Sequence, residues 1–303
     1  MERKLRTEFS LGDLTWFPSG GAVGTFLQPA HMADLAEFLR DLAVGTEVQV
    51  LGRGSNTLFS GDRFDGVVVY LGDRFGGFEI LPDRTLRVGG GALMTDVARS
   101  AMVQGLDITF LGAVPGTVGG AIVGNAGFLG KSICDYVMRA TVVLRDGSIQ
   151  TLKRATFAHP RERTKALKGA VMTQAVLALP EGEPEDLQES LTQTVRQHRA
   201  IFPEGPFCTG HVFSAESVGS ERGVHQSRFE RAAQILHRLG ELHLEGVSPY
   251  LDSAFPNIIF SEDAFDATKL QSFGEEIRSI CYREFSENLE WHLNIFGKRC
   301  LIQ

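Results

Sequence analysis

Two glycine-rich segments of the chain carry residues whose types and spacing could bind a ligand. The first, GRGSNT at residues 52–57, combines two glycines, a hydroxyl and an amide between apolar runs. Backbone N–H groups of such turns can form a concave array that holds a phosphate, and Ser and Asn side chains add donors. The second, GAVPGTVGGAIVGNAGFLG at residues 112–130, leaves the backbone bare at many positions. Together the segments indicate a site for a large flat or phosphorylated ligand.

The first segment lacks the pattern of a dinucleotide-binding loop that opens a helix. That pattern, G-x-G-x-x-G, needs a third glycine and a following helix. This chain has Thr57 at the third position and a strand pattern after it. Taken alone, either glycine segment is compatible with tight turns in a compact β-rich domain. For both segments together that interpretation is weak, so ligand binding is favoured.

Hydrophobic periodicity predicts the elements that hold these segments. Apolar residues at helical spacing indicate an amphipathic helix at residues 29–43. A second helix is predicted at 95–104, with Thr95 as N-cap and Gly105 after its end. Apolar runs at 48–51 and 66–71 indicate strands on both sides of the first glycine segment. Short strands are expected across 135–179, with an Asp-Gly turn between two of them.

The rest of the chain is expected to be mainly helical. Proline and acidic residues at 180–186 interrupt the pattern and predict a domain boundary, after which helix-forming sequence runs to about residue 200. Further helices are predicted at 228–239 and 267–284, before a closing strand at 289–296.

Composition and charge narrow the class of protein. Of the 303 residues, 43% are hydrophobic and 22% charged, and a net charge of −7 with dispersed basic residues argues against nucleic acid or anionic lipid as a partner. No apolar run reaches the roughly 18 residues of a spanning helix, and the first residues lack the apolar core of a signal peptide, so a cytoplasmic protein is expected. The cysteines and histidines show no metal-ligand spacing, so no metal site is expected.

Several motifs resemble one family of flavoenzymes. GRGSN is similar to the family's G-G-G-S-N loop, PGTVGGA at 115–121 matches P-G-T-V-G-G-A, and NAGFLG at 125–130 resembles N-A-G-x-x-G, in the same order and spacing. Residues 232–243 and FPNIIF at 255–260 extend the likeness over most of the chain. The family is that of the UDP-N-acetylenolpyruvoylglucosamine reductases, or UDP-N-acetylmuramate dehydrogenases, which use FAD and NADPH to reduce an enolpyruvyl nucleotide sugar.

The resemblance implies an α+β fold. It comprises a two-lobed FAD-binding domain of the vanillyl-alcohol-oxidase/UDP-N-acetylmuramate dehydrogenase type and a smaller α+β substrate lobe. The FAD-binding domain is expected at residues 1–182, with lobes at roughly 1–70 and 71–182, and the substrate lobe at 183–295. Residues 296–303 are expected to form a tail that returns to the first lobe.

The resemblance also implies that the two glycine segments share one FAD. The expected cofactor-binding residues are Gly52, Arg53, Gly54, Ser55, Asn56, Thr57, Pro115, Gly116, Thr117, Gly119, Gly120, Asn125, Ala126 and Gly127. NADPH is the electron donor that the family uses. The expected partner is a small-molecule substrate, with a nucleotide sugar as the family's example.

The family's catalytic positions are changed in this chain. GHVFSAE puts His211 where the family has a proton-donating serine, and LEWHLNIFG puts His292 where it has a glutamate. In FAHPRE, Arg161 stands one residue out of register with the family's arginine. The candidate catalytic residues are therefore these three together with Glu290.

The two histidines offer an alternative proton route. Imidazole can donate or accept a proton near neutral pH, so His211 is a candidate acid and His292 a candidate base or charge stabiliser, with a pH limb near ~6 to 7. Glu290, two residues earlier on a strand, would share a face with His292 and orient its ring. Each histidine could instead be a hydrogen-bonded structural residue. Tyr250 and Asp252 fall where the substrate lobe would face a substrate.

Three functions are compatible with these features. Intact cofactor motifs beside changed substrate-side positions favour an FAD-dependent oxidoreductase that acts on a different substrate or by a different proton route. The second is the peptidoglycan-pathway reductase itself, with histidine in place of serine. The third is a flavin-binding protein with non-redox catalysis or no turnover.

Overall fold

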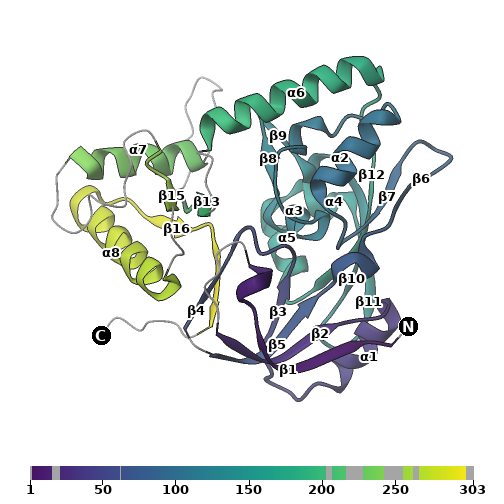
Figure 1. The fold of residues 1–303 in the computed structure, drawn as a ribbon, viewed down its shortest axis with the longest axis horizontal. Coiled ribbons are helices and arrows are strands. Elements are labelled where there is room, and N and C mark those ends of the chain that lie inside the picture. The colour runs from purple at the N-terminus through teal and green to yellow at the C-terminus, as the bar shows by residue number, and fades with distance from the viewer. Residues whose placement is uncertain are drawn as a thin grey trace. The chain divides into compact units, whose positions relative to one another are not determined.

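The computed structural model describes residues 2–15, 21–61, 63–202, 207–215, 228–241, 255–261 and 266–297, and these form a mixture of helices and strands (Figure 1). The strands are β1 (Lys4–Ser10), β2 (Ala22–Gln28), β3 (Val48–Leu51), β4 (Thr57–Ser60), β5 (Arg63–Tyr70), β6 (Phe78–Ile80), β7 (Leu86–Gly89), β8 (Gly127–Phe128), β9 (Lys131–Ser132), β10 (Val137–Val143), β11 (Ile149–Lys153), β12 (Val171–Leu177), β13 (Phe207–His211), β14 (Phe213–Ala215), β15 (Ile258–Ser261), β16 (Leu289–Trp291) and β17 (Asn294–Gly297). The α-helices are α1 (Met32–Asp41), α2 (Met94–Val103), α3 (Val118–Gly124), α4 (Arg154–Ala158), α5 (Pro160–Leu167), α6 (Pro184–Ile201), α7 (Arg228–Glu241) and α8 (Ala267–Phe285). Short 3₁₀ helices are η1 (Gly12–Leu14), η2 (Gly72–Phe75), η3 (Thr109–Leu111) and η4 (Ile133–Asp135).

The chain divides into two compact units. Unit 1 comprises residues 1–9, 23–53 and 65–198, and unit 2 comprises residues 10–22, 54–64 and 199–303. The division crosses the first glycine segment between Arg53 and Gly54, and it groups most of α6 with unit 1. The three-lobe division proposed from the sequence, with a boundary near residue 182, differs from these units and stays a prediction.

Among the described residues, unit 1 contains a four-stranded sheet, a five-stranded sheet and the short β8–β9 ladder. The four-stranded sheet has the order β1-β2-β5-β3, and β3 runs parallel to β5 with Leu51 opposite Tyr70. The five-stranded sheet has the order β11-β10-β12-β7-β6, with antiparallel neighbours. Gly147 makes the turn between β10 and β11 at φ +77°, and its N–H donates to the Leu144 carbonyl at 3.0 Å. The Asp-Gly turn expected from the sequence is therefore confirmed.

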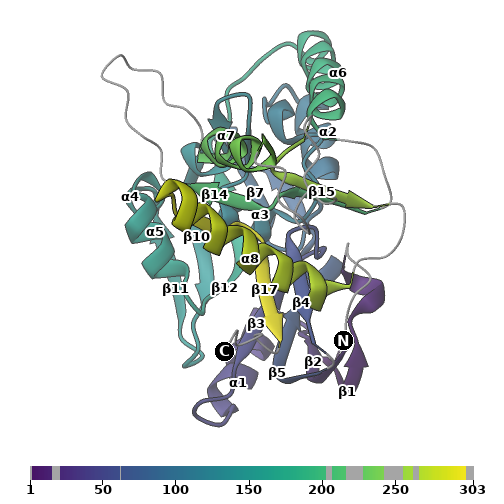
Figure 2. The same cartoon turned by 90° about the vertical axis from the view of Figure 1, so that its left-hand side faces the viewer.

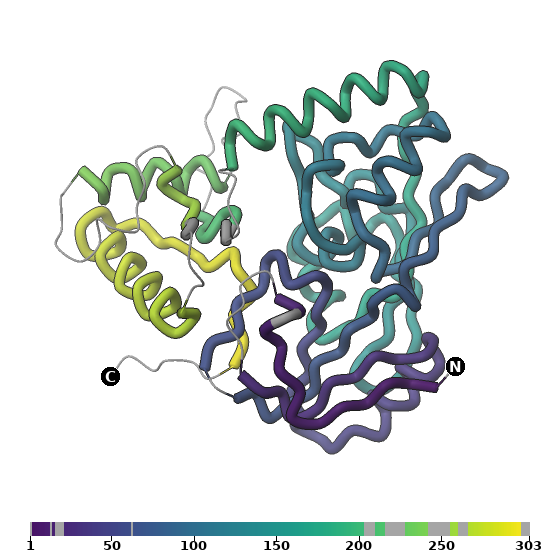
Figure 3. Tube along the Cα trace, viewed as in Figure 1, coloured from purple at the N-terminus to yellow at the C-terminus, as the bar shows by residue number. Residues whose placement is uncertain are grey.

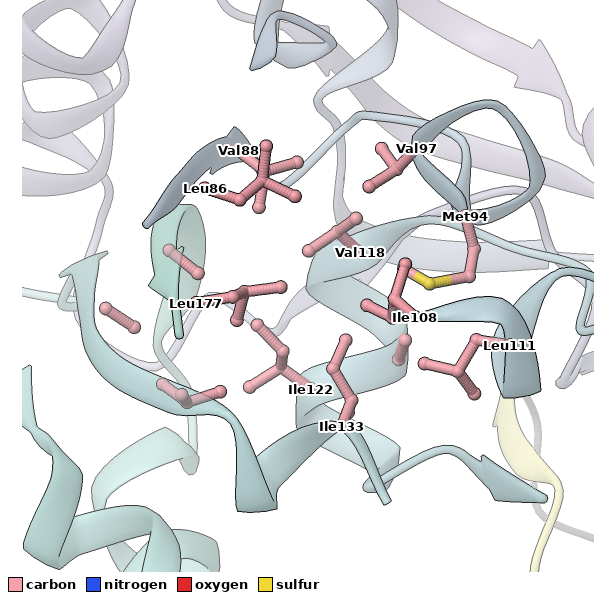
Figure 4. Close-up of a cluster of buried hydrophobic side chains, with 14 of the residues drawn as sticks. Leu86, Val88, Met94, Val97, Ile108, Leu111, Val118, Ile122, Ile133 and Leu177 are labelled. Atoms are coloured by element: carbon pink, nitrogen blue, oxygen red, sulfur yellow. The ribbon is translucent and has the colours of Figure 1, made fainter. Parts of the chain in front are cut away.

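Buried apolar side chains hold the helices of unit 1 in place. Val118 and Ile122 of α3 point into one cluster with Met94 and Val97 of α2 and Leu177 of β12 (Figure 4). Each of these side chains is at most 1% exposed. Because α3 is part of the second glycine segment, this core fixes the position of that segment within unit 1.

Unit 2 is built from short ladders covered by two helices. β13 pairs with β15 and β14 pairs with β16, both antiparallel, while β17 runs parallel to β4. In the Cα trace, the yellow segment near residue 295 lies beside the blue segment near residue 58 (Figure 3). Helices α7 and α8 lie close to one another (Figure 2). Ile235 of α7 and Ile277 of α8 are fully buried in one core with Phe213 of β14. Pairing with β4 brings the start of the expected C-terminal tail to a strand within the first 70 residues, and residues 298–303 lie outside the described part of the chain.

Two sequence expectations are wrong in detail, and one helix was not expected. Residues 135–179 do not form strands only, because α4 and α5 occupy 154–167, where Pro160 begins α5. The second glycine segment is not made of turns alone, because it contains α3. The closing strand is broken at His292 and Leu293, since β16 pairs with β14 whereas β17 pairs with β4.

The described residues contain no helix that is both long and apolar enough to cross a membrane.

Candidate functional site

The two glycine segments meet where β3 ends and α3 begins. A Cβ atom on Gly52 would lie 2.7 Å from the Thr117 hydroxyl, which is closer than real Cβ contacts. Thr117 is the N-cap residue of α3, and its hydroxyl accepts from the Gly120 N–H at 3.3 Å. Glycine at position 52 is therefore required by the close approach of these two segments.

The first turn of α3 uses its own amides inside unit 1. The Gly119 N–H donates to Gly90 O and the Val118 N–H to Ala92 O, both at 2.9 Å. A Cβ atom on Gly119 would lie 2.8 Å from Gly90 O, so this position also needs glycine. The start of α3 is consequently not the open array of donors that would hold a phosphate at a helix N-terminus.

Backbone N–H groups that are not used within the protein are found on the first glycine segment instead. Within the described part of the chain, the N–H groups of Gly52, Arg53 and Gly54 donate to no acceptor of the protein. Gly54 adopts φ +67°, a conformation that favours glycine, and its carbonyl accepts from the Thr57 N–H at 3.4 Å. A turn with successive unused N–H groups fits a pyrophosphate.

The exposed face of α3 is flat. Gly120 and Gly124 are exposed and carry no side chain, and Val123 between them is 50% exposed. A Cβ atom on Gly124 would meet no atom within 4 Å. Asn125 ends the helix in the left-handed conformation at φ 53°, and its side-chain oxygen accepts from Cys134 N at 3.4 Å. This bare, partly apolar surface suits a flat ring system.

The other residues expected to bind FAD have structural contacts. Asn56 donates from Nδ2 to His292 O at 3.0 Å, and its carbonyl accepts from Asn294 N at 2.9 Å, all within unit 2. Thr57 is buried in β4. The carbonyl of Gly116 accepts from Met94 N at 3.1 Å. Pro115 and Gly127 are exposed, and Ala126 is half-buried.

The two candidate histidines come together on one aromatic ring. His211 ends β13 and stacks on Phe229 of α7, with ring centroids 4.6 Å apart and an interplanar angle of 7°. His292 follows β16 and meets the same ring in a T-shaped contact at 4.6 Å. Phe202 contacts His211 at 5.2 Å. His211 and His292, which lie 81 positions apart in the sequence, therefore share one cluster.

Burial determines the charge of His292. Burial, together with smaller charge repulsion from the nearby Arg228 and His211, lowers the pKa of the imidazole to about 4. His292 is therefore neutral at pH 7 and can accept a proton or a hydrogen bond. The pH limb near 6 to 7 expected for either histidine does not apply to this one.

Of the remaining catalytic candidates, Glu290 is not part of the aromatic cluster, and Arg161 belongs to the other unit. Glu290 is exposed on β16 opposite Ser214, and within the described residues it makes no hydrogen bond to His292. Arg161 is exposed in the first turn of α5. Their catalytic roles stay predictions, as do those of the histidines. Tyr250 and Asp252 lie outside the described residues.

Sequence reasoning missed Asn257, a buried residue next to the histidine cluster. Its side chain bonds to the backbone of Phe213 at 2.9 Å in both directions. The signal was present in FPNIIF, where a polar residue stands inside an apolar run. Among the described residues, no group of three or more His, Cys, Asp or Glu side chains could hold a metal ion.

Comparisons with known proteins find related sequences and a similar fold. A protein-family model described as an FAD binding domain matches residues 24–153. The UDP-N-acetylenolpyruvoylglucosamine reductase of Dinoroseobacter shibae is 32% identical over 95% of this chain and 94% of its own length. The enzyme of the same name from Roseobacter denitrificans is 31% identical with the same coverage. The crystal structure of UDP-N-acetylenolpyruvylglucosamine reductase from Thermus caldophilus has a TM-score of 0.73 at 20% identity, covering 98% of this chain and 100% of that one.

Proposed function

The chain belongs to the UDP-N-acetylenolpyruvoylglucosamine reductase family, and from that premise we propose that it catalyses an FAD-dependent reduction by a proton route that differs from the family's. It is an FAD-dependent oxidoreductase of α+β fold, as its relatives and the matched FAD-binding domain show. The proposal concerns the substrate side. The observation that carries it is the meeting of His211 and His292 on Phe229, at positions where the family motifs have serine and glutamate.

The glycine segments fit the cofactor. Gly52, Arg53 and Gly54 would offer backbone N–H groups to the pyrophosphate, and the bare face of α3 at Gly120 and Gly124 would accept a ring. When bound, FAD supplies hydride transfer. The protein contributes binding, orientation and the proton.

The histidines take different parts in the proposed route. His211 holds the proton that is delivered to the substrate, because its ring stands at the serine position of the motif. His292 is neutral at pH 7, so its ring offers one N–H donor and one nitrogen acceptor, which orient the substrate or stabilise developing negative charge by a hydrogen bond. Phe229 keeps both rings in a partly apolar environment, which strengthens each electrostatic contact.

The substrate in this proposal is a small molecule carrying a reducible double bond, with NADPH as electron donor. The names of the relatives favour a second candidate, reduction of the enolpyruvyl nucleotide sugar itself, since the likeness spans 95% of this chain. The first candidate is preferred because serine-to-histidine and glutamate-to-histidine changes occur together at the substrate side.

Anaerobic mixing of the purified flavoprotein with NADPH tests the proposal. We expect the flavin absorbance to bleach and then recover when the true substrate is added. Recovery with the enolpyruvyl nucleotide sugar at a rate typical of the family would favour the second candidate. The flavin can be reduced by NADPH, by NADH or by dithionite. If the reduced flavin is then reoxidised by oxygen alone and by no substrate, redox turnover is excluded.

A further inference from the structure

Val212 lies between β13, which ends at His211, and β14, which pairs with the strand before His292. β13 ends at His211 and β14 begins at Phe213, so the chain changes its ladder partner from β15 to β16 at Val212. The Val212 N–H donates to Asn257 O at 3.0 Å, and Val212 O accepts from His292 N at 2.8 Å. The spacing of the two histidine backbones is therefore set by this one residue and its partners.

The side chain of Asn257 takes the place of a strand backbone beside Phe213. Oδ1 accepts from Phe213 N and Nδ2 donates to Phe213 O, both at 2.9 Å. A carboxamide carries the same donor and acceptor pair as a peptide unit, so it can replace one where β15 (Ile258–Ser261) has not yet begun. Asn257 is 3% exposed, so water does not replace these bonds.

A third bond of the same amide reaches the ring between the histidines. Nδ2 of Asn257 also donates to Phe229 O at 3.4 Å, in the first turn of α7. The Phe229 ring stacks on His211 and meets His292 edge to face. One buried side chain thus holds both the backbone between the imidazoles and the ring that separates them.

We propose that Asn257 is a positioning residue that sets the relative placement of His211 and His292. The inference rests on the proposed function, because it takes the two imidazoles as the working groups of the site. Aspartate at this position would keep the acceptor and the shape, but it would remove both N–H donors and place a carboxylate against two carbonyl oxygens.

The imidazole of His292 reports on this placement. The charged or titratable groups that act on it among the described residues are Arg228 on α7 and His211 on β13, while Glu290 on its own strand is exposed. A displaced first turn of α7 would move Arg228 and Phe229 together. Water would then reach His292, and its affinity for protons would rise.

NMR titration of the FAD-loaded full chain with ¹³C-labelled histidine tests the proposal. In Asn257→Asp we expect the proton affinity of His292 to rise at least about tenfold, which is one pH unit. We also expect the ring-current shift of His211, caused by stacking on Phe229, to decrease. If Asn257→Asp does not fold, Asn257→Ser, which keeps a short hydroxyl but cannot span Phe213 and Phe229, must show the same two changes.

Gln271 supplies a matched control in the same unit. It is a 6% exposed amide on α8, and its Oε1 accepts no hydrogen bond within the described structure. Gln271→Met should leave both histidine signals unchanged. A folded Asn257→Asp protein with wild-type titration curves and ring-current shifts, whatever its stability, would overturn the proposal, as would equal changes in Gln271→Met. The readout needs no turnover, so failure of the proposed function, seen as the absence of substrate-dependent flavin reoxidation, is measured separately.

Discussion

The region around Gly52 and α3 in unit 1, called the cofactor region because the proposed function places FAD there, and the histidine cluster of unit 2 are built on opposite principles. At Gly52 and on the exposed face of α3, the important feature is the lack of side chains, which leaves backbone N–H groups and a flat surface open. Around Phe229, the important feature is the side chains themselves, brought from β13, α7 and the end of β16. The first kind of site tolerates few substitutions at its glycines, whereas the second can exchange one reactive group for another.

If the proposed function holds, this difference explains how one region could retain the family's residues while the other changed. A Cβ atom on Gly52 or Gly119 would meet atoms at 2.7 and 2.8 Å, so these positions accept only glycine without rearrangement. His211 and His292 are half-buried at the edge of their ladders, where a ring of different chemistry can be accommodated. Chemistry on the substrate side can therefore change without loss of the cofactor.

The largest expected effect comes from a charge on the flat face of α3. Gly120 is exposed, and a Cβ atom there would meet only the Thr117 hydroxyl, at 3.5 Å. Gly120→Asp should preserve the fold, because an acidic residue in the first turn of a helix is favourable. It should weaken FAD binding by roughly 10²-fold through charge repulsion and overlap with the cofactor. Flavin content after purification and FAD titration measure this.

Gly77→Asp is the matched control for that variant, because Gly77 is exposed and a Cβ atom there meets nothing within 4 Å. Equal FAD binding in Gly120→Asp and Gly77→Asp would remove α3 from the cofactor site. Gly54→Asp is a poorer test, since φ is +67° and a Cβ atom would lie 2.6 Å from Thr15 Cα.

The next effect concerns the stability of unit 2 at acidic pH. The His292 pKa is about 4 in the folded protein and 6.5 in the reference state. The unfolded chain therefore binds more protons between these values, and the free energy of unfolding falls as the pH falls from about 6.5 to 4, by at most about 3 kcal/mol. Below pH 4 this residue causes no further loss.

Urea denaturation at several pH values measures this contribution in the wild type and in His292→Gln. The glutamine variant should show a flatter dependence of unfolding free energy on pH over this window. His237→Gln, at an exposed position of α7, is the control and should keep the wild-type dependence. Identical pH dependence in the wild type and His292→Gln would contradict the burial of a neutral imidazole.

Two smaller effects on the free energy of unfolding, opposite in sign, are expected at a tightly packed and an open glycine of unit 2. A Cβ atom on Gly274 of α8 would lie 2.0 Å from the Trp291 ring, whose N–H is fixed by a bond to Glu275 at 2.6 Å. Gly274→Ala should destabilise the protein by about 1 to 3 kcal/mol through overpacking. Gly240→Ala on α7 meets nothing within 4 Å and should stabilise it by about 0.5 to 1 kcal/mol.

Thermal or urea unfolding of the two variants tests this pair. Both proteins should retain FAD binding, because neither position lies in the glycine segments. A stabilising Gly274→Ala would show that Trp291 can move without cost, and the packing of β16 against α8 would then be looser than described.

The sequence predicted single elements better than the long-range pairings between them, for physical reasons. Glycine motifs are local, and the elements at 48–51 and 228–239 have clear periodicity, so β3 and α7 were found close to their observed bounds. α3 was missed because its glycines have low helix propensity, and bonds to Gly90 and Ala92 from elsewhere in the fold support it.

Long-range pairing could not be inferred in the same way. The break of the closing strand at His292 depends on two different partners, β14 and β4, and no local pattern encodes it. The contact of both histidines with Phe229 depends on where α7 begins, after residues 216–227, which lie outside the described part. Motif positions suggested that the histidines belong together, but only the packed structure supplied the ring between them.

Separate measurement of the two half-reactions in His211→Ala tests the central claim most directly. The claim is that the cofactor region works independently of the replaced proton donor, so flavin content and the rate of flavin reduction by NADPH should equal those of the wild type. Reoxidation of the flavin by the true substrate should slow by roughly 10²- to 10⁴-fold, whereas the exposed control His237→Ala should behave as wild type. Unchanged substrate-dependent reoxidation in His211→Ala would contradict the account, because the histidine cluster would then take no part in the chemistry.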